Sequence, residues 1–319
     1  MTPPSNFHHL VDEYLNARRG LGFRLETQEG YLRDFARHAE RIGHSGPVTI
    51  ELAVRWALAS RSTNPVQAAR RLAIVRQFAQ YRALVDPATE VPPVGFLGPI
   101  PRRRSTPHIY TEAEIAALLE QARCLRPRDG LRPATYGAFF ALLASTGLRL
   151  SEARRLTTDD ADLVDGILTI RETKFRKSRL VPLHPTTTRA LRRYADRRDA
   201  CLAAPRSDYF FRTEKASRLS LTSVETTFRE LRRRLDWTAQ GRTRQPRIHD
   251  LRHSFVVRRL LRWHQEGADV DRKILALATY LGHAKVADTY WYCTAVPELL
   301  ASTGQRFERF AHQASERPS

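Results

Sequence analysis

The residues best suited to chemistry gather in one stretch of the sequence, residues 247–297. It begins with RIHDLRHSF, in which His249, Arg252 and His253 stand at positions i, i+3 and i+4. A helix would place all three on one face, because residues three and four apart are neighbours on a helix surface. The sequence therefore predicts a helix that presents two imidazoles and a guanidinium together.

The second part of this stretch adds tyrosines. An apolar run ends in Leu-Gly-His, with His283 as its last residue, and Tyr290 and Tyr292 follow. Basic and imidazole side chains beside a tyrosine, in a strongly basic chain, indicate chemistry on a phosphodiester.

Composition limits the partners of this chemistry. The chain has 319 residues, which favours two domains, and 42% of them are hydrophobic, enough for ordinary globular cores. The 53 Lys and Arg residues exceed the 34 Asp and Glu residues and give a net charge of +19. Such a charge favours nucleic acid first, with a membrane surface as the competing partner. A basic chain from an arginine-rich proteome is the plainer explanation.

Nothing in the sequence indicates export or insertion into a membrane. No apolar run approaches about 18 residues, and the first residues, MTPPSNFHHL, are polar, unlike a signal peptide. The three cysteines, Cys124, Cys201 and Cys293, are scattered and form neither a zinc pattern nor a disulfide framework. We therefore expect a cytoplasmic protein in a reducing compartment.

The first 85 residues read as an all-α module of four helices. Asn64 and Pro65 mark the start of the fourth helix, as its cap and its first residue. The expected helices are two within 5–42, broken near Gly20 and Gly22, then 49–60 and 65–85. Residues 86–107 contain so many prolines and glycines that we predict an extended linker. Its arginine run, 102–104, is either solvated or in contact with phosphate.

The remaining residues read as a mixed domain with one small sheet. Thr111 and Glu114 form a capping box, and the nearly apolar segment 132–146 predicts a buried central helix that stops at Gly147. A short helix capped by Ser151 is expected next. The strands GILTIRE and RLVPL flank a basic turn and predict a β-hairpin. Further helices are expected at 186–203, 221–235 and 297–312.

Arg149 and Glu152 lie three residues apart at the start of the short helix. The plain reading of the pair is a salt bridge on a helix surface. In the functional reading, Glu152 fixes an active-site side chain while Arg149 aims a planar guanidinium at a phosphate. The pair alone does not separate the two readings.

Five separated stretches, taken in order, resemble the catalytic domain of the tyrosine recombinases, the phage integrase family. ALLASTGLRLSEARRL resembles the first arginine box and places the first arginine at Arg149, with Glu152 as its acidic partner. TKFRKSRLVPL resembles the β-hairpin box, in which Lys174 takes the position of the catalytic lysine. The turn departs from the family pattern, because Phe175 stands where a glycine is usual, and Lys177 remains an alternative to Lys174.

The other three stretches lie near the C-terminus. HDLRH resembles the second arginine box, with His249 and the second arginine, Arg252. LGH supplies His283, and Tyr292, nine residues later, takes the position of the nucleophile. The resemblance covers residues 108–300, and the N-terminal helices also resemble the core-binding domain of the family.

Other residues are candidates for supporting roles. His253 is expected to pack or to form a hydrogen bond beside the site, and Tyr290 is the rival of Tyr292 as nucleophile. Candidate DNA contacts are Thr27, Arg70, Arg71, Arg102, Arg103, Arg104, Arg176 and Lys177.

The resemblance implies a strand transfer that needs neither metal nor ATP. The two arginines would hold the non-bridging oxygens of a phosphate while Tyr292 attacks phosphorus. The product is a 3′-phosphotyrosine with a free 5′-hydroxyl, and a hydroxyl of the second strand reverses the step. Lys174 would protonate the leaving oxygen, His249 would serve as general base and phosphate ligand, and His283 would donate a further hydrogen bond.

The tail resembles recombinases of bacterial transposable elements. Its YWY sequence precedes the helix expected at 297–312. Leu299, Leu300, Phe307 and Phe310 give that helix an apolar stripe, which packs either on its own domain or on a neighbouring protomer.

We therefore expect a mainly α protein with three parts. These are an N-terminal four-helix core-binding (SAM-like) domain over 1–85, the linker 86–107, and a mixed α+β catalytic domain over 108–319 that contains a small sheet. No cofactor and no metal ion are expected.

The implied function is site-specific recombination during integration, excision or transposition of a mobile element. A tetramer, or a complex with related recombinases, would exchange strands through a Holliday junction on double-stranded DNA sites with inverted repeats, in the cytoplasm at the nucleoid. The alternatives are a type IB topoisomerase-like nicking-closing enzyme and a catalytically idle accessory protein that binds DNA.

Overall fold

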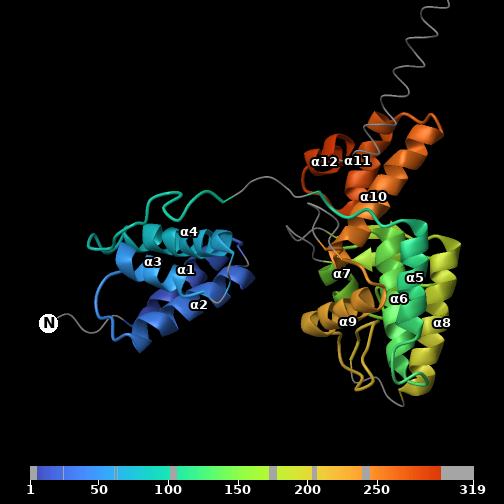
Figure 1. The fold of residues 1–319 in the computed structure, drawn as a ribbon, viewed down its shortest axis with the longest axis horizontal. Coiled ribbons are helices and arrows are strands. Elements are labelled where there is room, and N and C mark those ends of the chain that lie inside the picture. The colour runs from blue at the N-terminus through green and yellow to red at the C-terminus, as the bar shows by residue number, and fades with distance from the viewer. Residues whose placement is uncertain are drawn as a thin grey trace, which may run out of the picture. The chain divides into compact units, whose positions relative to one another are not determined.

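The structure is a computed structural model that divides the chain into two compact units, Met1–Arg104 and Ser105–Ser319 (Figure 1). Each unit is described by itself. The residues described are 6–23, 25–60, 62, 64–100, 106–171, 178–202, 207–238 and 245–295, with the backbone alone for Pro65 and 293–295.

The N-terminal unit contains the four predicted helices. They are α1 (Phe7–Gly20), α2 (Glu26–Arg41), α3 (Ile50–Leu58) and α4 (Pro65–Arg82). The predicted start of α4 is confirmed, because the Asn64 side chain accepts a hydrogen bond from the amide of Val66 at 3.1 Å. Phe35 lies at the centre of the core and makes edge-to-face contacts with Phe7, Trp56 and Phe78.

The first part of the predicted linker, 86–107, packs on this unit. The amide of Glu90 donates to the carbonyl of Val48 at 2.8 Å, and Val91 and Leu97 pack against the core. Its prolines exclude a helix or strand here, but they leave neighbouring apolar side chains able to pack. Residues 101–105 of the same segment lie outside the described residues.

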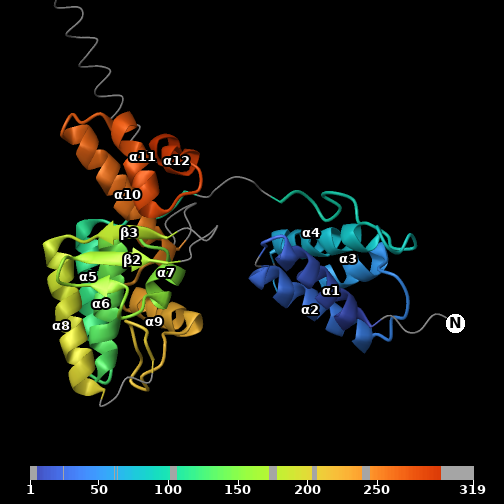
Figure 2. The same ribbon diagram turned by 180° about the vertical axis from the view of Figure 1, so that it is seen from behind.

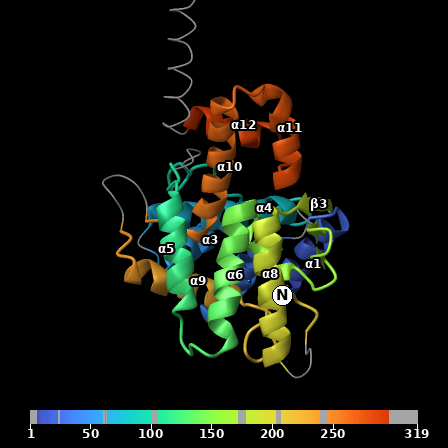
Figure 3. The ribbon, with the colours of Figure 1, turned by 90° about the vertical axis from the view of Figure 1, so that its right-hand side faces the viewer.

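The C-terminal unit is a block of helices with a small sheet. Its helices are α5 (Glu112–Arg123), α6 (Leu131–Thr146), α7 (Leu150–Arg155), α8 (Pro185–Cys201), α9 (Leu221–Arg234), α10 (Ile248–Gln265), α11 (Val270–Leu281) and α12 (Ala287–Ala295). As predicted, α6 is the buried central helix, and it packs between α5 and α8 (Figure 3). The helix predicted at 297–312 lies outside the described residues.

The sheet has three antiparallel strands in the order β1-β2-β3. They are β1 (Ala161–Asp162), β2 (Ile167–Ile170) and β3 (Arg179–Pro182), so the predicted hairpin is confirmed and the sequence analysis missed β1. β3 also contacts α11, and Figure 2 shows the sheet at the end of the helical block that faces this helix. A mainly α fold with one small sheet is therefore confirmed.

The prediction that Ser151 caps the short helix is wrong. The N-cap of α7 is Arg149, and Ser151 already lies within the helix. The reason is Glu152, whose carboxylate accepts the amide hydrogen of Arg149 at 2.9 Å and so takes over the capping interaction. The predicted stop of α6 is confirmed, because Gly147 ends it in the left-handed conformation with φ 63°.

Within the described ranges, every helix is too short or too polar to cross a lipid bilayer.

Candidate active site

Arg252 joins the C-terminal ends of two helices. Its side chain is 3% exposed, and it donates from Nη1 to the carbonyl of Gly147 at 2.6 Å and from Nη2 to that of Leu281 at 2.9 Å. These carbonyls end α6 and α11, where helices carry partial negative charge. The buried guanidinium is thus held by two helix ends that approach each other.

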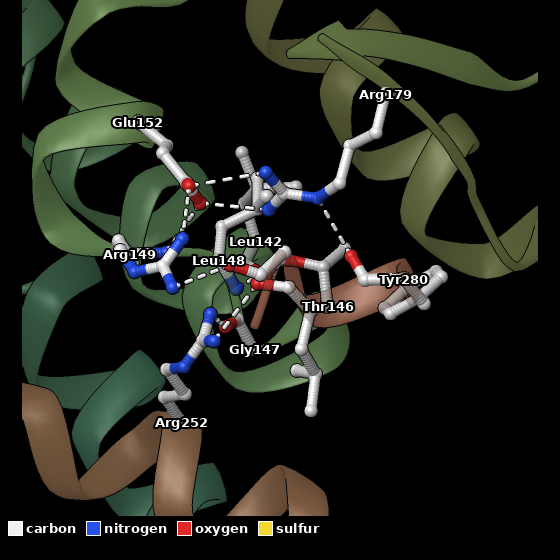
Figure 4. A network of polar contacts seen from close by, with 11 residues as sticks. Leu142, Thr146, Gly147, Leu148, Arg149, Glu152, Arg179, Arg252 and Tyr280 are labelled. Atoms are coloured by element: carbon white, nitrogen blue, oxygen red, sulfur yellow. Dashed lines mark hydrogen bonds and ion pairs between the residues drawn. The ribbon is translucent and has the colours of Figure 1, made fainter. Parts of the chain in front are cut away.

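Arg149 lies beside Arg252 in the same network (Figure 4). Its Nη1 donates to Oε1 of Glu152 at 2.8 Å, and its Nη2 donates to the carbonyl of Gly282 at 2.7 Å. The side chain of Arg149 is 29% exposed, whereas that of Glu152 is 7% exposed. The pair is therefore a partly buried element of the cluster and not a surface salt bridge.

Arg179 is a third arginine of the cluster, and the sequence analysis missed it. It donates to both oxygens of Glu152, at 3.1 Å and 2.8 Å, and from Nε to the carbonyl of Tyr280 at 2.7 Å (Figure 4). The available signal was strand alternation. Arg179 shares a face of β3 with the buried Val181, and an inward-facing charge requires a partner.

The rings of α10 lie against the tyrosine of α12. Nδ1 of His253 is 2.7 Å from the hydroxyl of Tyr292, and the two ring centroids are 5.4 Å apart. The ring of His249 contacts that of His253 at a centroid distance of 4.8 Å, as the predicted helical spacing requires. Among these contacts, His253 rather than His249 is bonded to the hydroxyl of the predicted nucleophile.

Tyr290 and Tyr292 lie on different sides of α12. Tyr290 is 41% exposed, and its hydroxyl donates to Asp271 at 2.9 Å. Tyr292 is 3% exposed and packs in a cluster with residues of α10 and α11. Tyr292 contacts His253 of α10 with both its hydroxyl and its ring.

His283 follows the end of α11 and contacts α12, the helix that carries Tyr292. Its Nδ1 is 2.7 Å from Oγ1 of Thr289, a fully buried residue of α12. Gly282, just before it, ends α11 in the left-handed conformation with φ 65° and so turns the chain towards His283. This turn brings His283 next to the carbonyl that Arg149 binds.

Burial and charge shift the ionisation of this cluster. Burial, followed by the positive charge of Arg149, lowers the pKa of Arg252 to about 10. Burial also lowers the pKa of His249, and the charge of Arg252 acts in the same direction. Although burial opposes it, the hydrogen bonds and charge of Arg179 hold the pKa of Glu152 below its usual value. Opposite charge on a ligand would relieve the repulsion between the arginines.

The predicted DNA contacts of the N-terminal unit divide into two kinds. Thr27 and Arg70 are exposed. Arg71 instead stacks on Trp56, 3.9 Å from the ring centroid, and donates to Asp34 at 3.3 Å and to the carbonyl of Trp56 at 3.0 Å. These contacts occupy Arg71 within its own unit.

The other predicted site residues lie outside the described part of the chain. They are Arg102, Arg103, Arg104, Lys174, Arg176 and Lys177. Within the described ranges, no three His, Cys, Asp or Glu side chains lie together in a way that could hold a metal ion.

Comparison with known proteins identifies the family of this arrangement. The model described as "Phage integrase family" matches residues 109–298, which contain the whole cluster. The chain belongs to the phage integrase family. This is the family of the tyrosine recombinases that the five sequence stretches resemble, so that prediction is confirmed.

Relatives of this integrase-family chain match it over nearly its full length. It is 43% identical to a putative integrase/recombinase, y4rB, of Sinorhizobium fredii over 309 residues, 96% of this chain and 98% of the relative. It is 31% identical to the tyrosine recombinase XerD of Mycobacterium tuberculosis, over 88% of this chain and 90% of the relative.

A solved structure has the same fold at low sequence identity. The Tn1549 transposon integrase, in complex with transposon right end DNA, aligns with a TM-score of 0.60 and 17% identity, over 94% of this chain and 98% of that chain. This likeness shows that the two chains share a fold.

Proposed function

We propose that this chain is a site-specific DNA recombinase that cuts and rejoins strands through a 3′-phosphotyrosine at Tyr292. The proposal rests on one contact: the hydroxyl of the buried Tyr292 is bonded to the imidazole of His253. His253 lies on the same helix turn as the buried Arg252. Because Arg252 directly precedes His253 in α10, the hydroxyl that bonds His253 belongs to the same site as the buried arginine.

The arginines would stabilise the charge that develops on phosphorus. A guanidinium has five N–H donors, and the carbonyl bonds of Arg252 use two of them. Arg149 and Arg252 can therefore hold non-bridging oxygens without releasing the helix ends. Because both are fixed before the reaction, little reorganisation accompanies the attack, and losing one such group typically costs about 3–4 kcal/mol of transition-state stabilisation.

Proton transfer accompanies each step. Oη of Tyr292 bonds to phosphorus as the bond to the 5′-oxygen breaks, so the tyrosine loses one proton and the 5′-oxygen gains one. The contact at 2.7 Å supports His253 as the acceptor of the first proton, in place of the role predicted for His249. His249 and His283 then bind the phosphate, and Lys174 protonates the 5′-oxygen.

The wider role follows from the family. We assign Met1–Arg104 to core binding and Ser105–Ser319 to catalysis, on double-stranded DNA sites with inverted repeats. Four protomers, or this chain with related recombinases, would pass through a Holliday junction during integration, excision or transposition, without metal or ATP. The setting is the cytoplasm, at the nucleoid. The net charge of +19 supports DNA as the partner.

A nicked suicide substrate tests the chemistry, because the fragment beyond the nick diffuses away and traps the phosphotyrosine. The wild-type chain should form a covalent complex that survives denaturation, and Tyr292→Phe should form none. Tyr290→Phe is the matched control and should react like the wild type. A covalent complex formed by Tyr292→Phe would refute the assignment of Tyr292 as nucleophile. If the wild type forms no covalent complex, the accessory-protein alternative is favoured.

A second assay separates a recombinase from a topoisomerase. Relaxation of supercoiled plasmids that lack a recombination site would favour the topoisomerase alternative.

A further inference from the structure

Three arginines bind three consecutive carbonyls at the end of α11 (Figure 4). Arg179 donates to the carbonyl of Tyr280, Arg252 to that of Leu281 and Arg149 to that of Gly282. The last carbonyls of a helix have no partner within the helix and lie at its negative end. The three guanidinium groups satisfy them and fix the position at which α11 ends.

We propose that Arg179 is a positioning residue of the active site. It holds the end of α11, from which the chain passes through His283 to the helix that carries Tyr292. It also holds both oxygens of Glu152, which in turn bonds Arg149. This inference rests on the proposed function, and it assigns Arg179 no contact with DNA.

The burial of Arg179 supports this role. Its side chain is 9% exposed and that of Glu152 is 7% exposed, so the ion pair is almost completely removed from water. A charge-assisted pair of this kind, with two parallel N–H···O bonds, fixes orientation as well as distance. Lysine carries the charge but lacks the planar fork, so it cannot bond the carboxylate twice and the carbonyl of Tyr280 at once.

The charge balance of the cluster supports the same conclusion. Arg149, Arg179 and Arg252 with Glu152 carry a net charge of +2. A phosphodiester carries one negative charge, and the pentavalent phosphorane that forms from it carries two once the nucleophile has lost its proton. When Arg179 binds Glu152, the negative charge of this carboxylate is shared between Arg179 and Arg149. Without Arg179, Glu152 would neutralise Arg149 alone and reduce the charge available to the transition state.

The competing explanation is that Arg179 only stabilises the fold. Removing one partner of a buried ion pair is strongly destabilising, because the other charge is left buried without compensation. Replacing both partners avoids this effect. The comparison of Glu152→Gln with the double variant Glu152→Gln/Arg179→Met therefore separates positioning from stability.

The experiment measures single-turnover cleavage of the nicked substrate at saturating protein, together with DNA affinity and thermal unfolding. We expect Arg179→Lys and Arg179→Met to cleave at least about a hundredfold more slowly, with DNA affinity within about threefold of the wild type. The double variant should unfold at a temperature no lower than that of Glu152→Gln, because it leaves no unpaired buried charge, and still cleave at least about tenfold more slowly than it. Equal cleavage by these two variants would overturn the inference.

Arg171→Met is the matched control. Arg171 follows β2 of the same hairpin and pairs at 2.5 Å with the carboxylate of Asp160, which is 6% exposed, but its own side chain is 64% exposed and touches none of the three carbonyls. This variant should cleave like the wild type. A loss equal to that of Arg179→Met would show that any hairpin arginine has the same effect, and would overturn the inference.

A substrate with sulfur in place of the bridging 5′-oxygen locates the defect. A thiolate leaves without protonation, so this substrate removes the need for a general acid such as Lys174. Arg179→Met should remain slow on it, because the arginine cluster and α11 are misplaced. Full recovery would mean that Arg179 acts through the leaving group, against the inference. If the wild type forms no covalent complex on either substrate, the proposed function fails, and not this inference alone.

Discussion

Nδ1 of His253 lies 2.7 Å from the hydroxyl oxygen of Tyr292. The imidazole also contacts the rings of Trp291 and His249, at centroid distances of 6.0 Å and 4.8 Å. Since Tyr292 is 3% exposed, its hydroxyl has little access to bulk water. A neutral imidazole with its proton on Nε2 accepts a hydrogen bond at Nδ1, and so is able to take the proton of the tyrosine.

The first prediction concerns this contact. His253→Phe should slow covalent complex formation by roughly a hundredfold or more, the usual contribution of a general base. His253→Asn keeps an amide near the position of Nδ1 but does not titrate. A protonated imidazole cannot accept the proton of the tyrosine, so the wild-type rate should fall in acid and the pH–rate profile should have an acid limb. His253→Asn should lose this limb of the pH–rate profile.

The matched variant for this test is His249→Asn. Burial and the charge of Arg252 lower the pKa of His249, so its imidazole stays neutral to lower pH than an ordinary histidine. A limb due to His249 would therefore lie below about pH 6.5. If His249→Asn removes the limb and His253→Asn keeps it, the acceptor is His249, as the sequence resemblance had implied.

The second prediction concerns the turn after α11. Gly282 has φ 65°, and a Cβ built on it would lie 2.7 Å from Nη1 of Arg179 and 3.3 Å from Nη1 of Arg149. Gly267 has φ 70° with nothing within 4 Å of such a Cβ. Gly267→Ala should therefore lose only about 1–2 kcal/mol of unfolding free energy, from backbone strain, and cleave normally. Gly282→Ala should lose more stability and also cleave more slowly, because both arginines must shift.

Denaturant unfolding and single-turnover cleavage measure the two effects separately. Equal stability and equal cleavage for the two alanine variants would mean that the arginines adjust to the added methyl group at no cost. The fixed arrangement of Arg149 and Arg179 would then be the wrong description of the site.

Local signals explain what the sequence predicted well. The capping box at Thr111 and Glu114 is present with both hydrogen bonds, at 2.7 Å and 3.1 Å. Gly147 adopts the left-handed conformation that ends α6. The spacing of His249 and His253 places their rings in contact. Each of these features depends on residues within one turn of helix, and such short-range preferences are visible in sequence.

Long-range contacts explain what the sequence did not reveal. Arg179 binds Glu152 and the carbonyl of Tyr280, which lie 27 and 101 residues away. The hydroxyl partner of His253 is 39 residues away. Ser151 was a reasonable cap by type, but Glu152 offered the better acceptor once Arg149 was fixed. The choice among several chemically suitable partners is made by packing, which composition and spacing do not encode.

The third prediction separates two adjacent arginines of α4. Arg71 stacks on Trp56 and bonds Asp34, with 12% of its side chain exposed, whereas Arg70 is exposed. Arg71→Gln should lower the unfolding free energy by about 1–3 kcal/mol, because the interactions of a buried charged group are lost. Arg70→Gln should leave stability unchanged and reduce the salt dependence of DNA binding by about one unit of slope, if Arg70 contacts a phosphate.

Thermal unfolding and DNA titrations at several salt concentrations measure these outcomes. A stable Arg71→Gln variant with a reduced salt slope would support the sequence-based prediction that Arg71 binds DNA. An unchanged slope for Arg70→Gln would remove Arg70 from the interface.

The last prediction is a loss of stability of the N-terminal unit in mild acid, caused by His38. This side chain is 7% exposed, and its Nδ1 accepts a hydrogen bond from Arg41 at 2.9 Å. Burial, followed by the positive charges of Arg41 and Arg55, lowers the pKa of His38. The unfolded chain, with an ordinary pKa of about 6.5, therefore binds the proton more readily than the folded chain. The contribution of His38 is fully present above about pH 6.5 and is lost as pH falls through the lowered pKa of the folded state.

His38→Asn tests this sign, because its amide oxygen keeps an acceptor for Arg41 without a titrating group. Hydrogen exchange of the α2 amides against urea, between about pH 7 and about pH 5 and corrected for the chemical exchange rate, reports the stability of this unit. The variant should show a weaker loss of stability in acid than the wild type. The matched control, His9→Asn, changes a side chain that is 68% exposed and should keep the wild-type slope. The same slope in all three proteins would show that His38 does not control the acid response.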